Sequence, residues 1–531
     1  MSVSFARKDM LPAHPPPGAQ RGVVKWLHEN MFSGWLNSTL SVLAALFIFS
    51  VLGELIPWAF LNGHWSTSSL AECRAADALL EPRRGFQVAD LFQLPLVFFS
   101  EVIAGLFSLD PVRILVSPWS AVVATWDAMQ AAPTASGACW AFLRPWWGAF
   151  IFGNQYPPDE RWRPVLAFGL LFAALSPVLF ADQKRNLTLI LGGVAAYAVL
   201  TLTLAAAPGV AMVFAILLCG GLLALAQVRA GALLWFTLIF PALCFWLLWG
   251  GSIWAPILTM FGFGLAFAVF RYASPYLGFA TAAGVGLVAA VIWWLLAQGH
   301  VVDAIHSLIP VGFAPVDSDR FGGFLLATVI GVTGITFSLP IGILLALGRQ
   351  SDMPIVKTLC VVFIETIRGV PLITLLFVAA FVLGFFLPPN ADFDLLLRVI
   401  ILVTFFAAAY LAEVLRGSLA ALPRGQYEAA DALGLDYWRA QRLIILPQAL
   451  KISIPSIVSS FIGLFKDTTL VIIVALYEPL KGITTLVRAD TNWKGIYWEP
   501  YIFVGTIFFV FCFGMSRYSK YLEHKLKTDH R

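Results

Sequence analysis

The chain has 531 residues, of which 60% are hydrophobic and 12% are charged. Soluble domains average about 45–50% apolar and about 25% charged residues, so this composition excludes a soluble globular enzyme and a disordered chain. A net charge of only +4 excludes a nucleic-acid binder, which needs clustered basic surface. A bilayer-spanning helix needs about 20 mostly apolar residues, and the chain holds enough for about twelve. The sequence therefore predicts an all-α polytopic membrane protein.

The N-terminal residues 1–37 carry basic side chains around a proline-rich stretch. They contain no short apolar core followed by a small-residue cleavage site, which argues against a cleaved signal peptide. The apolar run at 38–61 is long enough to span the bilayer. We expect residues 1–37 to be a cytoplasmic segment and the span at 38–61 to leave a large loop, residues 62–160, on the outer side.

Residues 91–128 lie inside this loop and are ambiguous. Glu101, Pro111, Arg113 and Pro118 interrupt or flank two apolar runs there. Ionisable residues are costly inside a bilayer, so these interruptions favour interfacial or re-entrant segments. Two additional spans would leave the chain on the same side, so the charge distribution does not exclude them.

Charge is nearly absent from the middle of the chain. Between residues 186 and 299 the only Asp, Glu, Lys, Arg or His residues are Arg229 and Arg271. The stretches before and between them are each about twice the minimum spanning length, so each predicts a helical hairpin, bent near Pro208–Gly209 and Gly250–Gly251. The basic residues then lie on one side, which the positive-inside rule makes cytoplasmic.

The complete set of predicted spans places both termini inside, in agreement with a basic C-terminal tail. The spans are expected at about 38–61, 164–181, 188–206, 210–228, 231–250, 252–270, 279–298, 322–347, 358–386, 395–415, 453–476 and 500–517.

The outer loop contains two of the six cysteines, Cys73 and Cys139. An oxidising compartment favours a disulfide between them, and two unpaired thiols are the alternative. The remaining cysteines lie in predicted spans, where they act as small apolar residues. The sequence shows no tight cluster of metal ligands, so no metal site is predicted.

A polar segment, residues 422–447, separates two of the predicted spans and is too long for a minimal turn. Good helix formers at 427–433 and 437–445 predict two short helices. Gly434 can adopt the left-handed conformation that ends the first helix, and Pro447 should stop the second. The sequence therefore predicts a cytoplasmic helix-turn-helix. On composition alone, an amphipathic loop lying on lipid headgroups is the alternative.

The spacing within this segment is more specific than its composition. Glu428-Ala429-Ala430 is followed after three residues by Gly434, after nine more by Ile444, and after one more by Leu446-Pro447. This pattern resembles the EAA loop of bacterial ABC importer permeases at every fixed position. In that family the loop is the coupling helix, seated in a cleft of the ATP-hydrolysing subunit. The resemblance implies that the ATPase-coupling residues are Glu428, Ala429, Ala430, Gly434, Ile444, Leu446 and Pro447.

Three further segments, 365–372, 410–417 and 466–470, resemble signatures of polar amino-acid permeases. The similarity covers residues 320–531 and implies a five-helix ABC importer permease core, with 422–447 as its coupling loop.

The preceding region, residues 38–319, exceeds a minimal permease. Its size and the stretch Gly137-Ala-Cys-Trp-Ala-Phe142 resemble the enlarged permease subunits of general L-amino-acid (Aap/Bzt-type) importers. The resemblance implies that residues 38–319 form an enlarged N-terminal membrane region, with 62–160 as its periplasmic loop.

Charged residues within or beside the predicted spans are candidates for the substrate pathway or for gating. Glu365 and Arg368 are three residues apart, so they share a helix face and can pair. Lys466 and Asp467 are adjacent and oppositely charged, and Thr468 follows them. Intramembrane charges usually face a cavity or a partner, and a zwitterionic amino acid needs a donor and an acceptor together. The alternative is that both pairs only fix helix packing.

The family resemblance implies a permease subunit of a binding-protein-dependent ABC importer for L-amino acids, in the bacterial inner membrane. The chain lacks a G-x-x-x-x-G-K-[ST] phosphate loop, so we expect it not to be an enzyme and to bind no cofactor. ATP and Mg²⁺ would bind a separate ATPase. The implied partners are an ATPase dimer, a second permease subunit in a heterodimer, a periplasmic amino-acid-binding protein and membrane lipid, with no nucleic acid.

Two other functions deserve comparison. A self-sufficient secondary transporter, driven by an ion gradient, often has about twelve spans, but it gives no reason for the EAA spacing, and internal repeats that would support it are not evident. A membrane enzyme acting on lipid-linked substrates would need a convergent set of His, Asp or Glu residues, and the sequence shows none.

Overall fold

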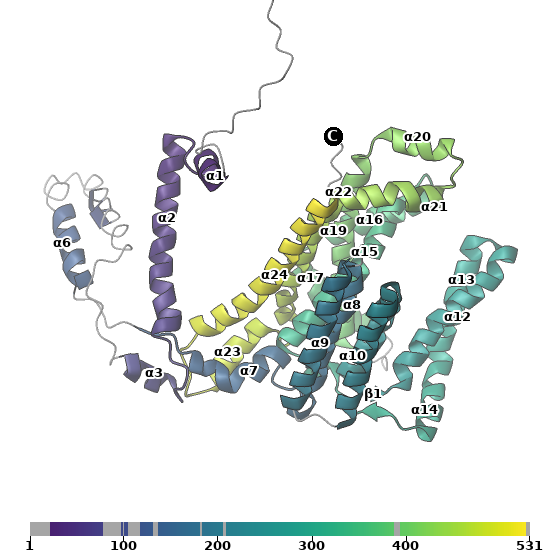
Figure 1. The fold of residues 1–531 in the computed structure, drawn as a ribbon, viewed down its shortest axis with the longest axis horizontal. Coiled ribbons are helices and arrows are strands. Elements are labelled where there is room, and N and C mark those ends of the chain that lie inside the picture. The colour runs from purple at the N-terminus through teal and green to yellow at the C-terminus, as the bar shows by residue number, and fades with distance from the viewer. Residues whose placement is uncertain are drawn as a thin grey trace, which may run out of the picture. The chain divides into compact units, whose positions relative to one another are not determined.

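The protein is known from a computed structural model, which is almost entirely helical (Figure 1). It divides into two compact units, Met1–Arg144 with Asp490–Glu499, and Pro145–Ala489 with Pro500–Arg531. The structure describes residues 22–77, 97–98, 100–102, 104, 117–130, 136–180, 183–204, 209–386 and 393–526.

The first unit is built on one long apolar helix, α2 (Trp35–Ile56), which continues through a π-helical turn, Pro57–Leu61. This 27-residue segment is long and apolar enough to span a membrane, as predicted for 38–61. Shorter helices accompany it: α1 (Gly22–Asn30), α3 (Leu70–Asp77), α6 (Ser117–Gln130) and a 3-10 turn at Trp140–Phe142. Residues 1–21 of the predicted cytoplasmic segment lie outside the described residues.

Much of the ambiguous segment 91–128 also lies outside the described residues. Its C-terminal part belongs to α6, which has 14 residues. That is shorter than the roughly 20 residues of a helix that crosses the bilayer.

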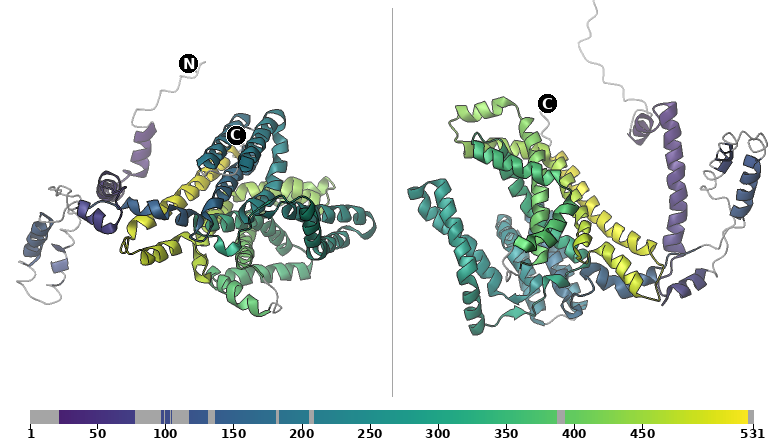
Figure 2. Two further views of the ribbon diagram at one scale, coloured as in Figure 1. Left: turned by 90° about the horizontal axis from the view of Figure 1, so that it is seen from below. Right: turned by 180° about the vertical axis from the view of Figure 1, so that it is seen from behind.

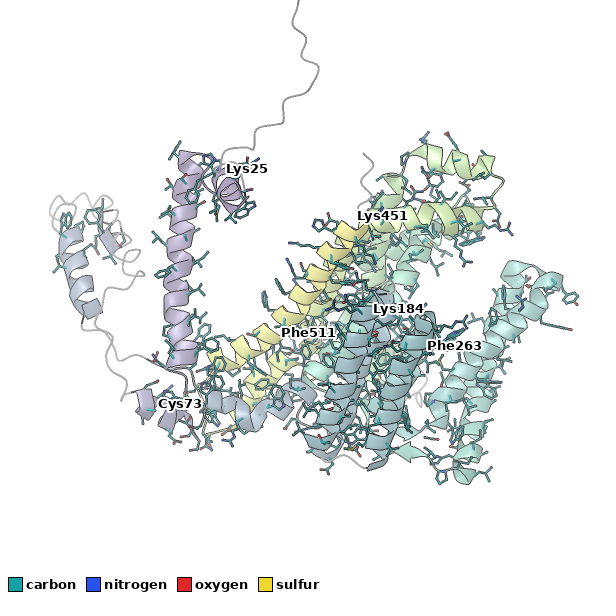
Figure 3. The ribbon with its side chains drawn as sticks, viewed as in Figure 1. Lys25, Cys73, Lys184, Phe263, Lys451 and Phe511 are labelled. Atoms are coloured by element: carbon teal, nitrogen blue, oxygen red, sulfur yellow. A yellow bond between two sulfur atoms is a disulfide. The ribbon has the colours of Figure 1, made fainter. Side chains whose placement is uncertain are left out.

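Cys73 and Cys139 lie together in the first unit, joined by a disulfide with their Cα atoms 6.1 Å apart (Figure 3 labels Cys73). Both side chains are buried. The backbone N–H of Cys139 donates to Glu499 Oε1 at 2.9 Å, and the indole N–H of Trp140 donates to the carbonyl of Ala59 at 2.6 Å. The disulfide therefore belongs to a packed junction that includes the end of the long helix.

We expect Cys73→Ser to destabilise the first unit by about 2–4 kcal/mol, because the disulfide closes a long loop and so restricts the unfolded chain. Thermal unfolding of the purified chain in detergent, with and without reductant, measures this effect. The double variant with Cys139→Ser should match the single variant, and Cys512→Ser, in α24, should leave the midpoint unchanged. Mass mapping under non-reducing conditions that finds both thiols free would contradict the prediction.

The second unit begins with a run of helices, of which α8, α9, α10 and α11 share one apolar core, and Figure 1 shows α8, α9 and α10 side by side. The elements are α7 (Leu143–Phe152), a 3-10 turn at Pro158–Glu160, α8 (Trp162–Leu179), α9 (Lys184–Leu204), α10 (Gly209–Arg229), a 3-10 turn at Ala230–Ala232, α11 (Leu233–Trp249), α12 (Trp254–Leu277), α13 (Phe279–Ile292), a π turn at Trp293–Ala297 and α14 (Gln298–Leu308).

The longest apolar segment, Ala211–Trp249, folds back on itself. Its 39 residues would extend about 58 Å as one straight helix, roughly twice the hydrocarbon thickness. The rings of Phe214 and Trp246, near its two ends, lie 6.1 Å apart, so α10 and α11 are antiparallel. The spans predicted separately at 210–228 and 231–250 are therefore two antiparallel helices, joined by a turn at Ala230–Ala232.

The chain next reverses its direction at Gly250 and Gly251, between α11 and α12, as the sequence predicts. Both have positive φ angles, 71° and 75°, and a Cβ on Gly250 would lie 2.3 Å from the carbonyl oxygen of Ala314. Two short antiparallel strands, β1 (Gly251–Ser252) and β2 (Gly312–Phe313), pair at this end of the bundle.

The remaining helices form the C-terminal core. They are α15 (Gly323–Arg349), α16 (Pro354–Gly369), α17 (Leu372–Phe377), a π turn at Val378–Val382, α18 (Leu383–Phe386), α19 (Leu395–Ala420), α20 (Arg424–Ala432), α21 (Tyr437–Ala440), a π turn at Gln441–Ile445, α22 (Leu446–Asp467), a 3-10 segment at Thr468–Val474, α23 (Pro479–Ala489) and α24 (Trp498–Leu526). The backbones of α15 and α19 approach closely at Gly342. A Cβ added to this glycine would lie 2.9 Å from the Cβ of Leu411.

The span predicted at 358–386 is broken into a bent pair of helices, α16 and α17. α16 and α17 meet at an angle of 101°. Pro371 has no N–H to continue the helix and forces the preceding residue out of the helical region, and Val370 accordingly has φ −110° and ψ 131°.

By length and composition, ten helical segments of the described residues can span a membrane, or eleven if the bent pair counts as one span. Ala211–Trp249 is counted once although it contains two antiparallel helices. Figure 2 shows the long helices of the second unit in two further views. The predicted all-α polytopic membrane fold is confirmed.

One buried acid predicts a pH dependence of stability. Glu478 is fully buried, caps the start of α23 by accepting from the N–H groups of Leu480 and Lys481, and has its pKa raised by burial from 4.5 to about 7. The unfolded chain loses this proton near pH 4.5 and the folded chain near 7, so the free energy of unfolding should fall by about 3 kcal/mol between these pH values and then level off.

Thermal unfolding of wild type and Glu478→Gln between pH 4.5 and 8 tests this prediction. The glutamine stays neutral, so its unfolding midpoint should vary less over this range. Parallel pH profiles for the two proteins would contradict it.

Candidate functional site

The segment between α19 and α22 forms a helical projection, here called the prong, residues 422–447, which extends from the helix ends in Figures 1 and 2. Its first helix, α20, begins at Arg424, three residues earlier than predicted, and ends at Ala432. Gly434 then has φ +66°, and the N–H of Leu435 donates back to the carbonyl of Ala430 at 3.2 Å. The turn conformation expected of Gly434 is therefore present.

The second half of the prong differs from the prediction that Pro447 stops its helix. The chain continues as helix from Tyr437 to Val474, through the π turn at Gln441–Ile445. Pro447 occupies the first turn of α22, where a missing N–H is tolerated, and the π turn relieves the crowding that a proline ring causes in a regular helix. The prong is therefore continuous with α22.

The inward face of the prong packs against the bundle. Ala430 and Ile445 are buried, and Ile445 shares an apolar cluster with Leu415 and Leu419 of α19. The side-chain amide of Gln448 donates to Gln426 Oε1 at 2.8 Å, which ties α20 to α22. These contacts make the prong and the base of α22 one packed unit.

The outward face carries Glu428, Ala429 and Gly434, all exposed. Three large apolar side chains accompany them: Leu433, Trp438 and Leu443, which are 73%, 56% and 63% exposed. Exposed large apolar side chains on a segment that projects from the bundle suit a protein interaction site. The sequence analysis missed these three, although apolar residues within a polar segment were the available signal.

The residues of the spacing pattern thus separate into two groups. Glu428, Ala429, Gly434 and Pro447 are exposed, whereas Ala430 is buried and Ile444 and Leu446 pack against the apolar cluster. The first group can contact a partner, and the second holds the prong in place.

Glu365 and Arg368 do not pair with each other, so that interpretation is wrong. Arg349 Nη1 lies 2.8 Å from Glu365 Oε1, whereas Arg368 Nη1 lies 3.5 Å from Glu413 Oε2. Glu413 also lies 3.6 Å from Arg349 and pairs with Arg416. These five residues, here called the charged cluster, connect the end of α15 to α16 and α19.

Glu413 is the centre of this cluster. Its side chain is 24% exposed and contacts all three arginines. With three cations and two carboxylates, the cluster depends on Glu413 to limit repulsion among the arginines. The sequence analysis missed Arg349, which is distant in sequence from the other members.

Lys466, Asp467 and Thr468 lie where α22 gives way to the 3-10 segment. Thr468 is buried, its hydroxyl donates to the carbonyl of Phe465 at 2.7 Å, and it packs near Gly331 of α15. Lys466 is exposed and Asp467 is half-buried, and no ion pair joins them within the part of the chain that the structure describes.

A bundle of apolar helices long enough to span a membrane, with a helical prong that carries exposed apolar side chains, is typical of a polytopic membrane protein. Residues 338–528 match the family described as "Binding-protein-dependent transport system inner membrane component". The chain belongs to the amino-acid ABC transporter permeases, as full-length relatives show.

One relative, the glutamate/glutamine/aspartate/asparagine transport system permease protein BztC of Rhodobacter capsulatus, is 49% identical over 100% of this chain and 99% of its own length. The inner membrane amino-acid ABC transporter permease protein YhdY of Escherichia coli is 31% identical over 98% of each chain. A crystal structure of an amino acid ABC transporter with histidines is 26% identical, covers 38% of this chain and 91% of its own, and has a TM-score of 0.34.

These relatives confirm the predicted ABC importer permease and favour it over the secondary transporter. They are permease subunits rather than enzymes. Membership of this family implies an ATPase and a substrate-binding partner.

Proposed function

We propose that this permease carries L-glutamate, glutamine, aspartate and asparagine across the bacterial inner membrane. The 49% identity to BztC over the whole chain is the observation that carries this proposal. Residues 320–531 form the permease core, to which the family match at 338–528 lends support. Both termini are cytoplasmic and the loop 62–160 is periplasmic, in keeping with the positive-inside rule.

A separate ATPase dimer binds ATP and Mg²⁺ and receives the prong, and this chain binds no cofactor. Closure of the ATPase dimer moves the two prongs of a permease heterodimer. Because helix is continuous from Tyr437 to Val474 and Gln448 holds α20 through Gln426, a displacement of the tip is transmitted along α22. The far end of α22 carries Lys466, Asp467 and Thr468, which we assign to the pathway or its gate.

The charged cluster controls the same motion from the prong side, since it connects α15, α16 and α19 where α19 leads into the prong. Glu365 and Arg368 therefore act in gating rather than as a substrate site. A periplasmic binding protein delivers the amino acid to the opposite face of the heterodimer.

Reconstitution into liposomes tests the proposal. The chain, its second permease, the ATPase and the binding protein should together accumulate labelled glutamate and glutamine only with ATP. Uptake by this chain alone, driven by a proton or sodium gradient, would contradict it. ATP-driven uptake of other amino acids only would retain the importer and reject the proposed cargo.

A further inference from the structure

A cavity of about 1300 Å³ lies within the second unit. α8, α9 and α11 line one side, and α15, α19 and α24 line the other. The rings of Phe168 in α8 and Phe511 in α24 lie 5.8 Å apart at its wall, and Figure 3 labels Phe511. Small-molecule pockets usually have volumes of roughly 300–1,000 Å³, so this cavity suits a larger ligand.

The threonines in the cavity offer no free hydroxyl hydrogen. Each donates to a helix carbonyl: Thr201, Thr237, Thr328, Thr333 and Thr336. The carboxylate of Asp394 accepts from the N–H of Leu397 at 2.8 Å. Burying a charged amino acid without compensating partners is costly. The body of the cavity therefore suits hydrocarbon rather than the amino-acid cargo.

One end of the cavity carries the cation Arg161. Its guanidinium lies 5.6 Å from the ring of Phe152 and packs against Gly148, while its buried Nε has no hydrogen-bond partner among the residues that the structure describes. The nearby acid Glu160 pairs with Arg163 instead, at 2.7 Å. Arg161 belongs to none of the ion pairs that the structure describes.

The same end has the features of a membrane interface. Trp147, Trp162 and Trp249 line the cavity there, and indole rings concentrate at the level of the lipid headgroups. The N–H of Gly322 donates to the carbonyl of Phe152 at 3.1 Å, so this is also the end at which α15 begins. From there the apolar walls follow the helices towards the bilayer interior.

We propose that the cavity binds one glycerophospholipid, with a phosphate oxygen paired to Arg161 and the acyl chains between α8 and α15. Protein interiors are close-packed, so an apolar space of this size within the bilayer fills with hydrocarbon. An arginine at the interface without an acidic partner is complementary to phosphate. The lipid joins the N-terminal bundle to the permease core.

Native mass spectrometry of the purified importer complex, exchanged into detergent containing phosphatidylglycerol, tests this proposal. One lipid should stay bound to the wild-type chain. Val332→Trp fills the cavity and should remove it, whereas Val213→Trp, at a 57% exposed position on α10, should not. Arg161→Gln should lower occupancy about tenfold, as expected for one charge-assisted contact, and Arg229→Gln should not.

Equal lipid occupancy in Val332→Trp and Val213→Trp would overturn the proposal, as would equal occupancy in Arg161→Gln and Arg229→Gln. Equilibrium dialysis with labelled glutamine supplies a separate outcome. Glutamine binding that Val332→Trp abolishes would show that the cavity holds cargo, whereas unchanged binding would agree with a lipid site.

Discussion

Glu428→Ala should abolish ATP-driven amino-acid uptake while leaving the chain folded in the membrane. Glu428 is exposed on the outward face of the prong, so its removal leaves the bundle intact. A charge-assisted hydrogen bond contributes about 1.5–3 kcal/mol, so its loss should weaken ATPase binding by about tenfold to a hundredfold. Uptake into liposomes and co-purification of the ATPase measure the two effects.

A matched control is Glu523→Ala, which removes another exposed carboxylate from the end of α24. Its uptake and ATPase binding should equal those of wild type. If Glu428→Ala also behaved like wild type in both measurements, the prong would not be the ATPase-coupling element.

Glu413→Gln should produce the largest loss of stability among single charge removals in the charged cluster. Loss of the carboxylate leaves Arg349, Arg368 and Arg416 near one another with only Glu365 to balance them. Exposed ion pairs contribute about 0–1 kcal/mol and breaking a buried pair costs about 3–5 kcal/mol. Because the Glu413 side chain is 24% exposed, we expect Glu413→Gln to lower the free energy of unfolding by about 2 kcal/mol.

Glu365→Gln is the internal comparison. This carboxylate is 54% exposed and, among the described residues, forms an ion pair with Arg349 alone, so its loss should lower the free energy of unfolding by under about 1 kcal/mol. Thermal unfolding in detergent compares the two variants. A midpoint for Glu365→Gln as low as that for Glu413→Gln would show that Glu413 is not the centre of the cluster.

The succession of apolar helices was predictable from the sequence because bilayer thickness imposes a length on every apolar segment, although the described residues hold ten or eleven candidate spans rather than about twelve. Arg229 and Arg271 divide the uncharged region into stretches that are each long enough for two membrane-spanning helices. The contact between Phe214 and Trp246, on the antiparallel helices either side of Arg229, agrees with a turn at this arginine. Gly250 and Gly251 were recognisable as a reversal because only glycine adopts their conformation easily.

The prolines show where prediction from sequence fails. Pro371 produces a 101° bend that was overlooked within an apolar run, whereas Pro447 was expected to stop a helix and instead lies in the first turn of α22. Each of these prolines lacks a backbone N–H to donate. Packing then decides whether the helix axis bends, as at Pro371, or a π turn accommodates the proline ring, as at Pro447.

The charged cluster could not be derived from spacing alone. Glu365 and Arg368 share a helix face, but the end of α15 brings Arg349 closer to Glu365. That approach depends on tertiary packing, including the contact of Gly342 with Leu411. Likewise, the seven-residue pattern identified the prong, but it did not separate the exposed Glu428 from the buried Ala430.

A photoreactive amino acid placed at Leu433, which is 73% exposed at the tip of the prong, tests the central claim most directly. In the assembled importer, illumination should cross-link this position to the ATPase subunit. The same probe at Leu308, which is 81% exposed at the end of α14, should not cross-link to the ATPase. Cross-linking of position 433 to the periplasmic binding protein, with none to the ATPase, would contradict the account.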